Sequence, residues 1–591
     1  MARDRGASQP LLDEGNDEYE VIGGTDYETD RRKSRKVGAQ KCLHTIAFVF
    51  LGSLFVAAII LLAVLLIRVG GQAPRVKVTC GEVQGTYDVF KTVFSFKAIP
   101  YAAPPVGQRR WKPPEALSSA TCWNDVYMAD EFRSICSQRD PMNHSYVGEE
   151  DCLFLDINTP SLDSNANMPV LVYFHGGYLR FGDTRTPGYF ADKNLASKHH
   201  AVFVNVQYRV GTMGFLVLDQ LKDSTGNYGF LDQIQALKWV QENIGKFGGN
   251  KDCVTIYGQS SGGSSVLNLM ISPLAKGLFH RGWSASGSVF FNATLAEARK
   301  KNEFFVKRVG CDTAADVKEC LYNVPAENAT MLTYDEWGYG DALDIPRKDH
   351  LEHPLPVVDD IVFMAGLLDS FQQNLSVINR VPLMIGSTAQ ETDVFPDIRK
   401  GYSMDISKWS QETYKEYVTK HLDTFGENVT KIALKMYPYK KDPELPLMDL
   451  MSDARVTCAT NLITEAAANS LPGLVYRYVV TYWPSKPINA LRMPFDARYA
   501  FHLLDIFGFF DAMGMYMKDG SPTKADQNFA VQMQESMMLF AKTGEVFSAW
   551  ESYEKHSVAL IGEAIEVEGA YRKEYCKFWL NNGFFEYTWM N

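Results

Sequence analysis

The residues with the clearest chemical signature are Gly258-Gln-Ser-Ser-Gly262, which follow a short apolar run at 254–257 and precede a stretch of helical periodicity. This G-x-S-x-G pattern predicts a nucleophile elbow, a strained turn between a strand and a helix that exposes the hydroxyl of its central serine. Ser260 is therefore the predicted nucleophile. The backbone N–H of Ser261, at the start of the helix, is expected to form part of an oxyanion hole.

A second glycine-rich segment, His175-Gly-Gly-Tyr178, follows the apolar run at 170–174. A loop of this kind after a strand is expected to supply the remaining N–H groups of the oxyanion hole. Gly177 and Tyr178 are therefore assigned to the hole together with Ser261.

The elements that must position these residues alternate between strands and helices. Apolar runs rich in Val, Ile, Phe and Tyr at 170–174, 201–206 and 254–257 predict strands, and helical periodicity covers 231–244. Strands separated by helices predict a large, mostly parallel sheet flanked by helices, which is an α/β fold. No internal repeat or linker interrupts residues 78–591, so this part is expected to form one domain.

The composition is that of a globular protein with an acidic balance. The chain has 591 residues, of which 46% are hydrophobic and 22% are charged, and its formal net charge is −11. These values exclude collagen-like, low-complexity and wholly disordered architectures. Nucleic-acid binding is not expected, because proteins of that class carry basic patches. No cofactor and no metal are expected either.

Residues 45–67 contain no charged side chain and are long enough to cross the hydrocarbon core of a bilayer as one helix. They start too late and run too long for a cleaved signal peptide. More cations precede this segment than follow it, which predicts a cytosolic N-terminus. The expected parts are a disordered cytoplasmic tail (1–44), a transmembrane signal-anchor helix (45–67), a stalk (68–77) and an extracellular or lumenal domain (78–591).

Sequons and cysteines agree with an external location for the large domain. Cys42 alone of the ten cysteines precedes the predicted span, and its state, a reduced or a palmitoylated thiol, stays open. An odd number of cysteines follows the span, so at least one is free or pairs between chains. The expected location is the plasma membrane with the C-terminus outside, or alternatively an endolysosomal membrane. The predicted glycosylation sites are Asn143, Asn292, Asn328, Asn374 and Asn428.

Several longer segments have a characteristic sequence: Ile99-Pro-Tyr-Ala-Ala-Pro-Pro-Val-Gly107, Glu150-Asp-Cys-Leu-Phe-Leu-Asp-Ile157, Gln207-Tyr-Arg-Val-Gly211, Tyr228-Gly-Phe-Leu-Asp-Gln233 and Gly277-Leu-Phe-His-Arg281. In these segments the chain resembles the type-B carboxylesterase/cholinesterase family of α/β-hydrolases, over nearly all of residues 78–590. The resemblance implies an α/β-hydrolase fold. It also implies the disulfides Cys136–Cys152, Cys311–Cys320 and Cys458–Cys576, with Cys80–Cys122 as a suggested further pair and Cys253 left over.

Enzymes of this family use Ser, Glu and His in that chain order. By resemblance, Ser260 matches the nucleophile and Glu391, in Gly386-Ser-Thr-Ala-Gln-Glu391, matches the orienting acid. An alignment without gaps up to the Phe-Gly pair at Gly508 places Tyr499 at the histidine position. A phenol with a pKa near 10 cannot take the serine proton near neutral pH as imidazole does. The triad is therefore predicted to be impaired, and His502 is a rescue candidate if the loop is shifted by about one turn.

Two further departures from the family concern the pocket. The family has a third glycine where Tyr178 stands, and this side chain would restrict the backbone and crowd the acyl position. The interval between Cys136 and Cys152 has no Trp, so the aromatic platform that attracts a quaternary ammonium is missing. Choline esters are not expected as substrates.

Two functions follow from these observations. The first resembles the neurotactin-like branch of the family: a single-pass type II membrane glycoprotein, catalytically impaired, that acts in cell adhesion by binding an extracellular protein partner. The alternative is a membrane-anchored serine esterase that acts on a small ester through Ser260, Glu391 and a displaced base. The residue that faces Ser260 from the segment around Tyr499 discriminates between them.

Overall fold

The computed structural model describes residues 50–60, 73–221, 225–289, 291–332, 344–348, 355–394, 405–490, 496–518 and 520–589. The chain divides into two compact units, Met1–Gln72 and Ala73–Asn591. In the first unit, residues 50–60 form a helix, while Cys42 and the rest of the predicted span lie outside the described residues. Over the described ranges, no helix combines the length and the apolar character needed to cross a bilayer.

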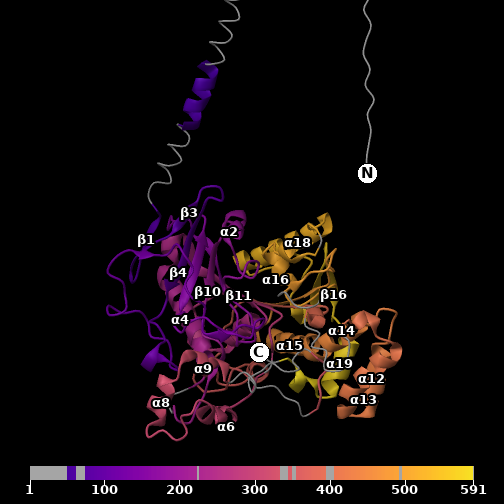
Figure 1. Ribbon diagram of the computed structural model, residues 1–591. Coiled ribbons are helices and arrows are strands. Elements are labelled where there is room, and N and C mark those ends of the chain that lie inside the picture. The colour runs from indigo at the N-terminus through magenta and orange to yellow at the C-terminus, as the bar shows by residue number, and fades with distance from the viewer. Residues whose placement is uncertain are drawn as a thin grey trace, which may run out of the picture. The chain divides into compact units, whose positions relative to one another are not determined.

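The second unit is built on an 11-stranded mixed sheet with the strand order β16-β15-β14-β13-β12-β11-β9-β10-β8-β4-β3 (Figure 1). From β10 to β15 along this order the neighbouring strands are parallel, and antiparallel pairs extend the sheet at both ends. The predicted mostly parallel sheet is thereby confirmed. The strands are β3 (Thr86–Asp88), β4 (Val93–Pro100), β8 (Phe154–Thr159), β9 (Met168–Phe174), β10 (Val202–Val206), β11 (Gly249–Gln259), β12 (Arg281–Ala285), β13 (Leu383–Thr388), β14 (Val475–Val480), β15 (Ser557–Ile561) and β16 (Ile565–Gly569).

The central strands coincide with the apolar runs of the sequence. The runs at 170–174, 201–206 and 254–257 lie in β9, β10 and β11, and every residue of β10 is buried. Strands covered on both faces read as continuous apolar runs because neither face meets water. The helical periodicity at 231–244 corresponds to α4 (Tyr228–Asn243), which starts slightly earlier.

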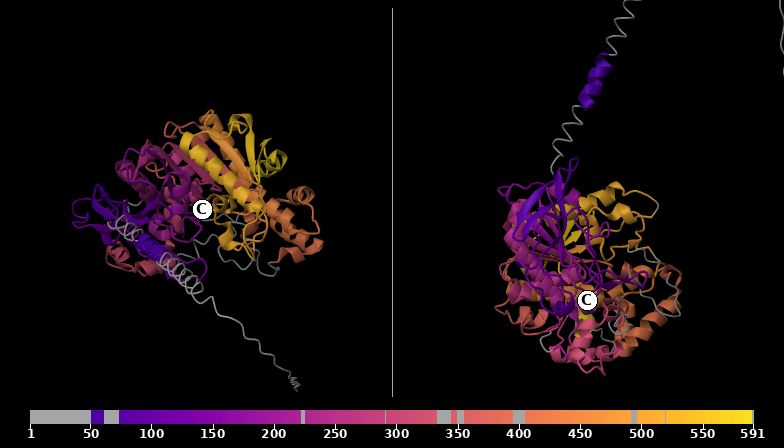
Figure 2. Two further views of the ribbon diagram at one scale, coloured as in Figure 1. Left: turned by 90° about the horizontal axis from the view of Figure 1, so that it is seen from above. Right: turned by 60° about the vertical axis from the view of Figure 1, so that its left-hand side comes forward.

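Helices lie on both sides of the sheet (Figures 1 and 2). Helices α5 and α18 both pack against β11, and α16 packs along α18. The helices used below are α5 (Ser261–Ile271), α12 (Gln411–Leu422), α13 (Glu427–Met436), α14 (Glu444–Ser452), α15 (Cys458–Ser470), α16 (Leu504–Phe509), α18 (Lys524–Thr543) and α19 (Lys573–Asn581), with the π-helix η7 (Asp453–Thr457) between α14 and α15.

The hydrophobic core has two main parts. The larger part follows the sheet and the helices that cover it. The smaller one lies among α12, α13, α14 and α19 and is rich in aromatic rings, including Trp409, Tyr417 and Trp579. These helices gather at the lower right of Figure 1.

A small three-stranded sheet begins the second unit: β1 (Arg75–Val78), β2 (Gly81–Gln84) and β5 (Tyr127–Met128). In β1 the side chains of Val76 and Val78 are buried while those of Arg75 and Lys77 are exposed. This alternation is typical of a strand with one face on the core. Residues 75–77, the last of the predicted stalk (68–77), therefore belong to the folded unit.

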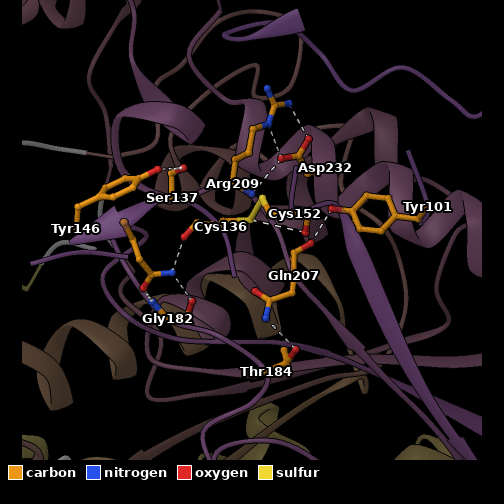
Figure 3. Close-up of a disulfide and its surroundings, with 11 residues drawn as sticks. Tyr101, Cys136, Ser137, Tyr146, Cys152, Gly182, Thr184, Gln207, Arg209 and Asp232 are labelled. Atoms are coloured by element: carbon orange, nitrogen blue, oxygen red, sulfur yellow. Dashed lines mark hydrogen bonds and ion pairs between the residues drawn. A yellow bond between two sulfur atoms is a disulfide. The ribbon is translucent and has the colours of Figure 1, made fainter. Parts of the chain in front are cut away.

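The cysteines are paired as the sequence analysis expected, and the asparagines of the predicted glycosylation sites are exposed. The structure contains the disulfides Cys80–Cys122, Cys136–Cys152, Cys311–Cys320 and Cys458–Cys576, while Cys253 is free. Figure 3 shows the second of these with the buried ion pair Arg209–Asp232 beside it. All five asparagines of the predicted glycosylation sites are exposed.

Candidate functional site

Ser260 lies at the turn between β11 and α5, as the motif predicts. Its backbone adopts φ 59° and ψ −128°, a conformation that non-glycine residues rarely adopt and that concentrates at functional sites. The flanking glycines make this turn possible, because a Cβ on Gly262 would lie 2.0 Å from the carbonyl oxygen of Phe174 and one on Gly258 would lie 2.4 Å from Gly262. The strained turn is therefore held between two backbone segments that approach closely.

Glu391 and His502 form a buried pair. Glu391 follows β13 and His502 precedes α16, and His502 Nδ1 lies 2.6 Å from Glu391 Oε2. Glu391 is fully buried and His502 is 2% exposed. The other carboxylate oxygen, Oε1, accepts hydrogen bonds from Ser286 Oγ and from the backbone N–H of Thr388, each 2.7 Å long. Both oxygens of the carboxylate are thus engaged, which fixes its direction toward the imidazole.

The second ring nitrogen of His502 faces the segment that carries Ser260. Nε2 lies 2.9 Å from the side-chain amide nitrogen of Gln259, the residue before Ser260. With Nδ1–H donating to Glu391, Nε2 carries a lone pair and accepts an N–H from Gln259. His502 therefore joins the buried acid to the strained turn, with its basic nitrogen on the side of the turn.

Tyr499 lies in a different environment, and the alignment that puts it at the histidine position is wrong in this structure. Its hydroxyl donates to Asp442 Oδ2 at 3.0 Å, and its ring packs edge-on against Trp483. Burial raises the pKa of the Tyr499 phenol. An alignment without gaps assumes that a fixed number of residues separates the base from α16, but the turn sets that number. Here Leu503, at φ 87°, turns the chain into α16 directly after His502.

One sequence signal could have favoured His502, the rescue candidate, over Tyr499. His502 is the only histidine between residues 422 and 555. It is also followed three residues later by Asp505, which lies fully buried behind the pair and accepts a hydrogen bond from the Tyr478 hydroxyl at 2.9 Å. Burial, together with the negative charge of Glu391, raises the pKa of Asp505 to about 6. Sequence reasoning did not single out this second carboxyl.

The glycine-rich loop lies against the turn of Ser260. A Cβ on Gly176 would stand 3.0 Å from the Cβ of Ser260. Gly177 adopts φ 117°, and the following Tyr178 adopts φ 58°. Ser261, the first residue of α5, follows Ser260 directly and is fully buried. The structure therefore brings the predicted oxyanion-hole residues to the neighbourhood of Ser260.

Two sets of contacts hold the glycine-rich loop in place. The His175 ring stacks on Tyr208 with centroids 4.3 Å apart, and the Tyr208 hydroxyl donates to the His175 carbonyl oxygen at 2.6 Å. In addition, Gln138, in the loop closed by the Cys136–Cys152 disulfide, accepts a hydrogen bond from Gly182 N at 2.7 Å and donates one to Gly182 O at 3.0 Å. Burial lowers the pKa of His175, which suits a neutral, structural imidazole.

Replacing Gly177 with alanine is expected to slow acyl transfer to Ser260, the predicted nucleophile, by about 100-fold or more, since loss of one oxyanion donor has an effect of that order. A Cβ at this position would lie 2.1 Å from the carbonyl oxygen of Phe181, so the loop must shift from its present position. Gly277→Ala is the matched control, because Gly277 also has positive φ (77°) but open space around a Cβ. Hydrolysis rates of the two variants check this prediction, and equal rates would contradict it.

A further side chain that the sequence did not predict lies at this site. The indole ring of Trp589, near the end of the chain, contacts His502 edge to face with ring centroids 4.5 Å apart. It shares a small buried cluster with Tyr178. Within the described part of the chain, no three or more His, Cys, Asp or Glu side chains are grouped so as to hold a metal ion.

Comparisons with known proteins agree with this geometry. The model of the carboxylesterase family matches residues 72–579. Para-nitrobenzyl esterase of Bacillus subtilis (strain 168) is 30% identical over 507 residues, which cover 83% of this chain and 94% of that protein. Carboxylesterase 1D of Rattus norvegicus is 29% identical over 547 residues, 86% of this chain and 92% of the relative.

Two other comparisons concern neurotactin and a solved structure. Neurotactin of Drosophila melanogaster is 31% identical over 416 residues, which cover 68% of this chain but only 46% of neurotactin. A solved structure of PNB esterase superposes with a TM-score of 0.67 at 28% sequence identity. That superposition covers 86% of this chain and all of the esterase chain.

Proposed function

Since this chain belongs to the carboxylesterase family and has the α/β-hydrolase fold, we propose that it hydrolyses carboxylic esters through Ser260, His502 and Glu391. The observation that carries this proposal is the buried His502–Glu391 pair, 2.6 Å apart, whose second ring nitrogen faces the turn of Ser260. The expected impairment rested on Tyr499 in the place of the base and on Tyr178 in the glycine-rich loop. The contact between His502 and Glu391 supports a base other than Tyr499, while Tyr178 remains a departure from the family pattern.

The chemistry would proceed in two steps. As Ser260 Oγ attacks the ester carbonyl carbon, His502 Nε2 takes the hydroxyl proton, and Glu391 stabilises the imidazolium that forms. Backbone N–H groups of Gly177, Tyr178 and Ser261 would stabilise the charge that develops on the carbonyl oxygen. The C–O bond to the alcohol then breaks, and the proton passes from His502 to the leaving alkoxide. Water, deprotonated by the same nitrogen, releases the acid and restores Ser260.

Gln259 has a defined place in this sequence of steps. Its amide N–H occupies His502 Nε2 at 2.9 Å, so the same lone pair that must take the serine proton is engaged by a neighbouring donor. The Gln259 side chain must therefore yield Nε2 to the Ser260 hydroxyl as the ester is attacked.

We test this function by reaction of the full-length protein, in membranes or detergent, with a fluorophosphonate probe, alongside hydrolysis of a short-chain aryl ester. Labelling and turnover in the wild type that disappear in Ser260→Ala are the expected result, because the probe bonds to an activated serine oxygen. A matched control is Ser272→Ala, at the other end of the same helix. Labelling that persists in Ser260→Ala, or that is absent from wild type and from the Trp589 variants described below, would contradict the proposal.

A second function is binding of an extracellular protein partner in cell adhesion, with residues 45–67 as a type II membrane anchor in the plasma membrane. The similarity to neurotactin over 68% of this chain and the uncharged segment of the sequence support this proposal. An endolysosomal membrane is the alternative location. Aggregation of cells that display the full-length protein, equal for wild type and Ser260→Ala, would separate this role from catalysis. Absence of aggregation with both would count against it.

A further inference from the structure

The last described residues of the chain lie against the proposed catalytic machinery. Trp589 is 1% exposed and contacts the ring of His502 edge to face. Its other neighbours are Tyr178 of the glycine-rich loop and Val456 of η7, with Phe181 packed against the cluster. One indole ring thus contacts both the base and the loop proposed to bind the oxyanion.

Hydrogen bonds hold the backbone of this segment in place. Arg455 in η7 does most of this: its carbonyl oxygen accepts the N–H of Trp589 at 3.0 Å, and its Nη1 donates to the carbonyl oxygen of Tyr587 at 2.8 Å. The Thr588 hydroxyl also donates to the Arg455 carbonyl oxygen. Three consecutive residues are therefore fixed by one arginine, in a π-helical turn of the kind that is frequent at functional sites.

A fourth contact ties the segment to the elbow helix. Ser288 Oγ donates to the carbonyl oxygen of Trp589 at 2.7 Å, and the Ser288 backbone N–H donates to Ser264 Oγ, also at 2.7 Å. Ser264 lies one turn into α5 and donates to the carbonyl oxygen of Ser260. The position of Trp589 is thus connected through Ser288 and Ser264 to the backbone of the proposed nucleophile.

The environment of Trp589 differs from that of a core tryptophan. Its cluster is separate from the two main cores. Its indole Nε1 is buried and has no hydrogen-bond partner among the described residues, although a buried tryptophan N–H usually finds an acceptor. An unpaired buried donor destabilises the arrangement that buries it. The unpaired indole N–H partly offsets the favourable contacts of the ring. The segment can therefore leave more easily.

We propose that the pocket formed by Tyr178, Val456 and His502 is an aryl-binding subsite of the ester-hydrolysing site, and that Trp589 occupies it as an internal ligand. This inference rests on the proposed function, and it adds the substrate class and the control of that site. The subsite takes flat, apolar groups, so esters with an aromatic acyl or alcohol part fit best. Residues 587–589 compete with such substrates and keep the site closed until they are displaced.

The disulfide Cys458–Cys576 supports this arrangement. Cys458 directly follows η7, which holds the segment, and Cys576 lies in α19, which leads to it. The cross-link therefore keeps the segment close to its binding place even when Trp589 leaves. Intramolecular binding of this kind acts at a high effective concentration, which makes the closed state favoured and yet reversible.

The first test compares the full-length wild type with Trp589→Ala in hydrolysis of a phenyl ester and in the rate of fluorophosphonate labelling. We expect both rates to rise at least tenfold. The peptide Phe-Phe-Glu-Tyr-Thr-Trp, added to the variant, is expected to inhibit it competitively. Trp239→Ala, which removes a tryptophan buried at 4% exposure in α4, controls for a general loosening of the fold and should not raise either rate. If Trp589→Ala does not fold, deletion of residues 588–591 takes its place.

The second test measures access to the site without catalysis. Ser260→Cys is made alone and together with Trp589→Ala, and alkylation of the introduced thiol by N-phenylmaleimide is followed by mass spectrometry of the peptide that carries it. The native thiol of Cys253 serves as internal reference. We expect the introduced thiol to be alkylated at least tenfold faster in the double variant, with the rate at Cys253 unchanged.

The outcomes of this second test separate the inference from the proposed function. Equal alkylation of the introduced thiol with and without Trp589→Ala, while the protein with Ser260 intact turns over esters, overturns the inference and leaves the proposed function standing. Faster alkylation in the double variant, with no turnover in any variant that keeps Ser260, supports the internal ligand and overturns the proposed function.

Discussion

Replacing His502 with glutamine is expected to lower kcat/KM for a short-chain aryl ester by about six orders of magnitude. Glutamine keeps a polar group near Glu391 but cannot take the Ser260 proton, and loss of the base from a serine triad has an effect of this size. The measurement is best made in the Trp589→Ala background, where turnover is expected to be faster. The fluorophosphonate reaction should slow in parallel, since it depends on the same activated oxygen.

Tyr499→Phe is the matched control for this experiment. Its hydroxyl contacts Asp442 rather than Glu391, so its removal is expected to change kcat/KM by no more than about threefold. The two variants together show which residue acts as the base: His502, as the structure indicates, or Tyr499, as the alignment without gaps indicates. A large loss in Tyr499→Phe, with His502→Gln still active, would return the catalytic role to the segment around Tyr499.

Replacing Asp232 with alanine is expected to lower the free energy of unfolding by about 3–5 kcal/mol, because it leaves the charge of Arg209 buried and unpaired. Asp232 is fully buried and Arg209 is 3% exposed, and the two side chains form two hydrogen bonds, 2.7 and 2.8 Å long (Figure 3). Burial raises the pKa of the Asp232 carboxyl, and the guanidinium of Arg209 opposes that rise. The midpoint of thermal unfolding, followed by tryptophan fluorescence, measures the effect.

Glu551→Ala controls for the loss of a carboxylate in general. Glu551 and Lys555 form an exposed pair four residues apart, 2.7 Å between charged atoms, and such pairs contribute at most about 0.5 kcal/mol. We expect its unfolding midpoint to equal that of the wild type within error. A similar loss in both variants would show that the buried pair contributes no more to the free energy of unfolding than an exposed pair does.

The sequence alone determined the features that depend on residues close together in the chain. The elbow is one of them, because Gly258, Ser260 and Gly262 stand in a fixed five-residue spacing between a strand and a helix, and only glycine allows the backbone approaches found there. The central strands are another, because a strand buried on both faces must be an unbroken apolar run. The cysteine pairs followed from the family resemblance.

The side chain that pairs with Glu391 and the ring that contacts it were decided only by the tertiary structure. His502 meets Glu391 across 111 positions of sequence, and a single turn at Leu503 sets which residue of its segment faces the acid. Counting residues back from Gly508 takes no account of that turn, so the count placed Tyr499 at the position of the base. Trp589 reaches His502 from the end of the chain through contacts with η7 and the elbow helix. No local pattern encodes such contacts, because packing between distant segments fixes them.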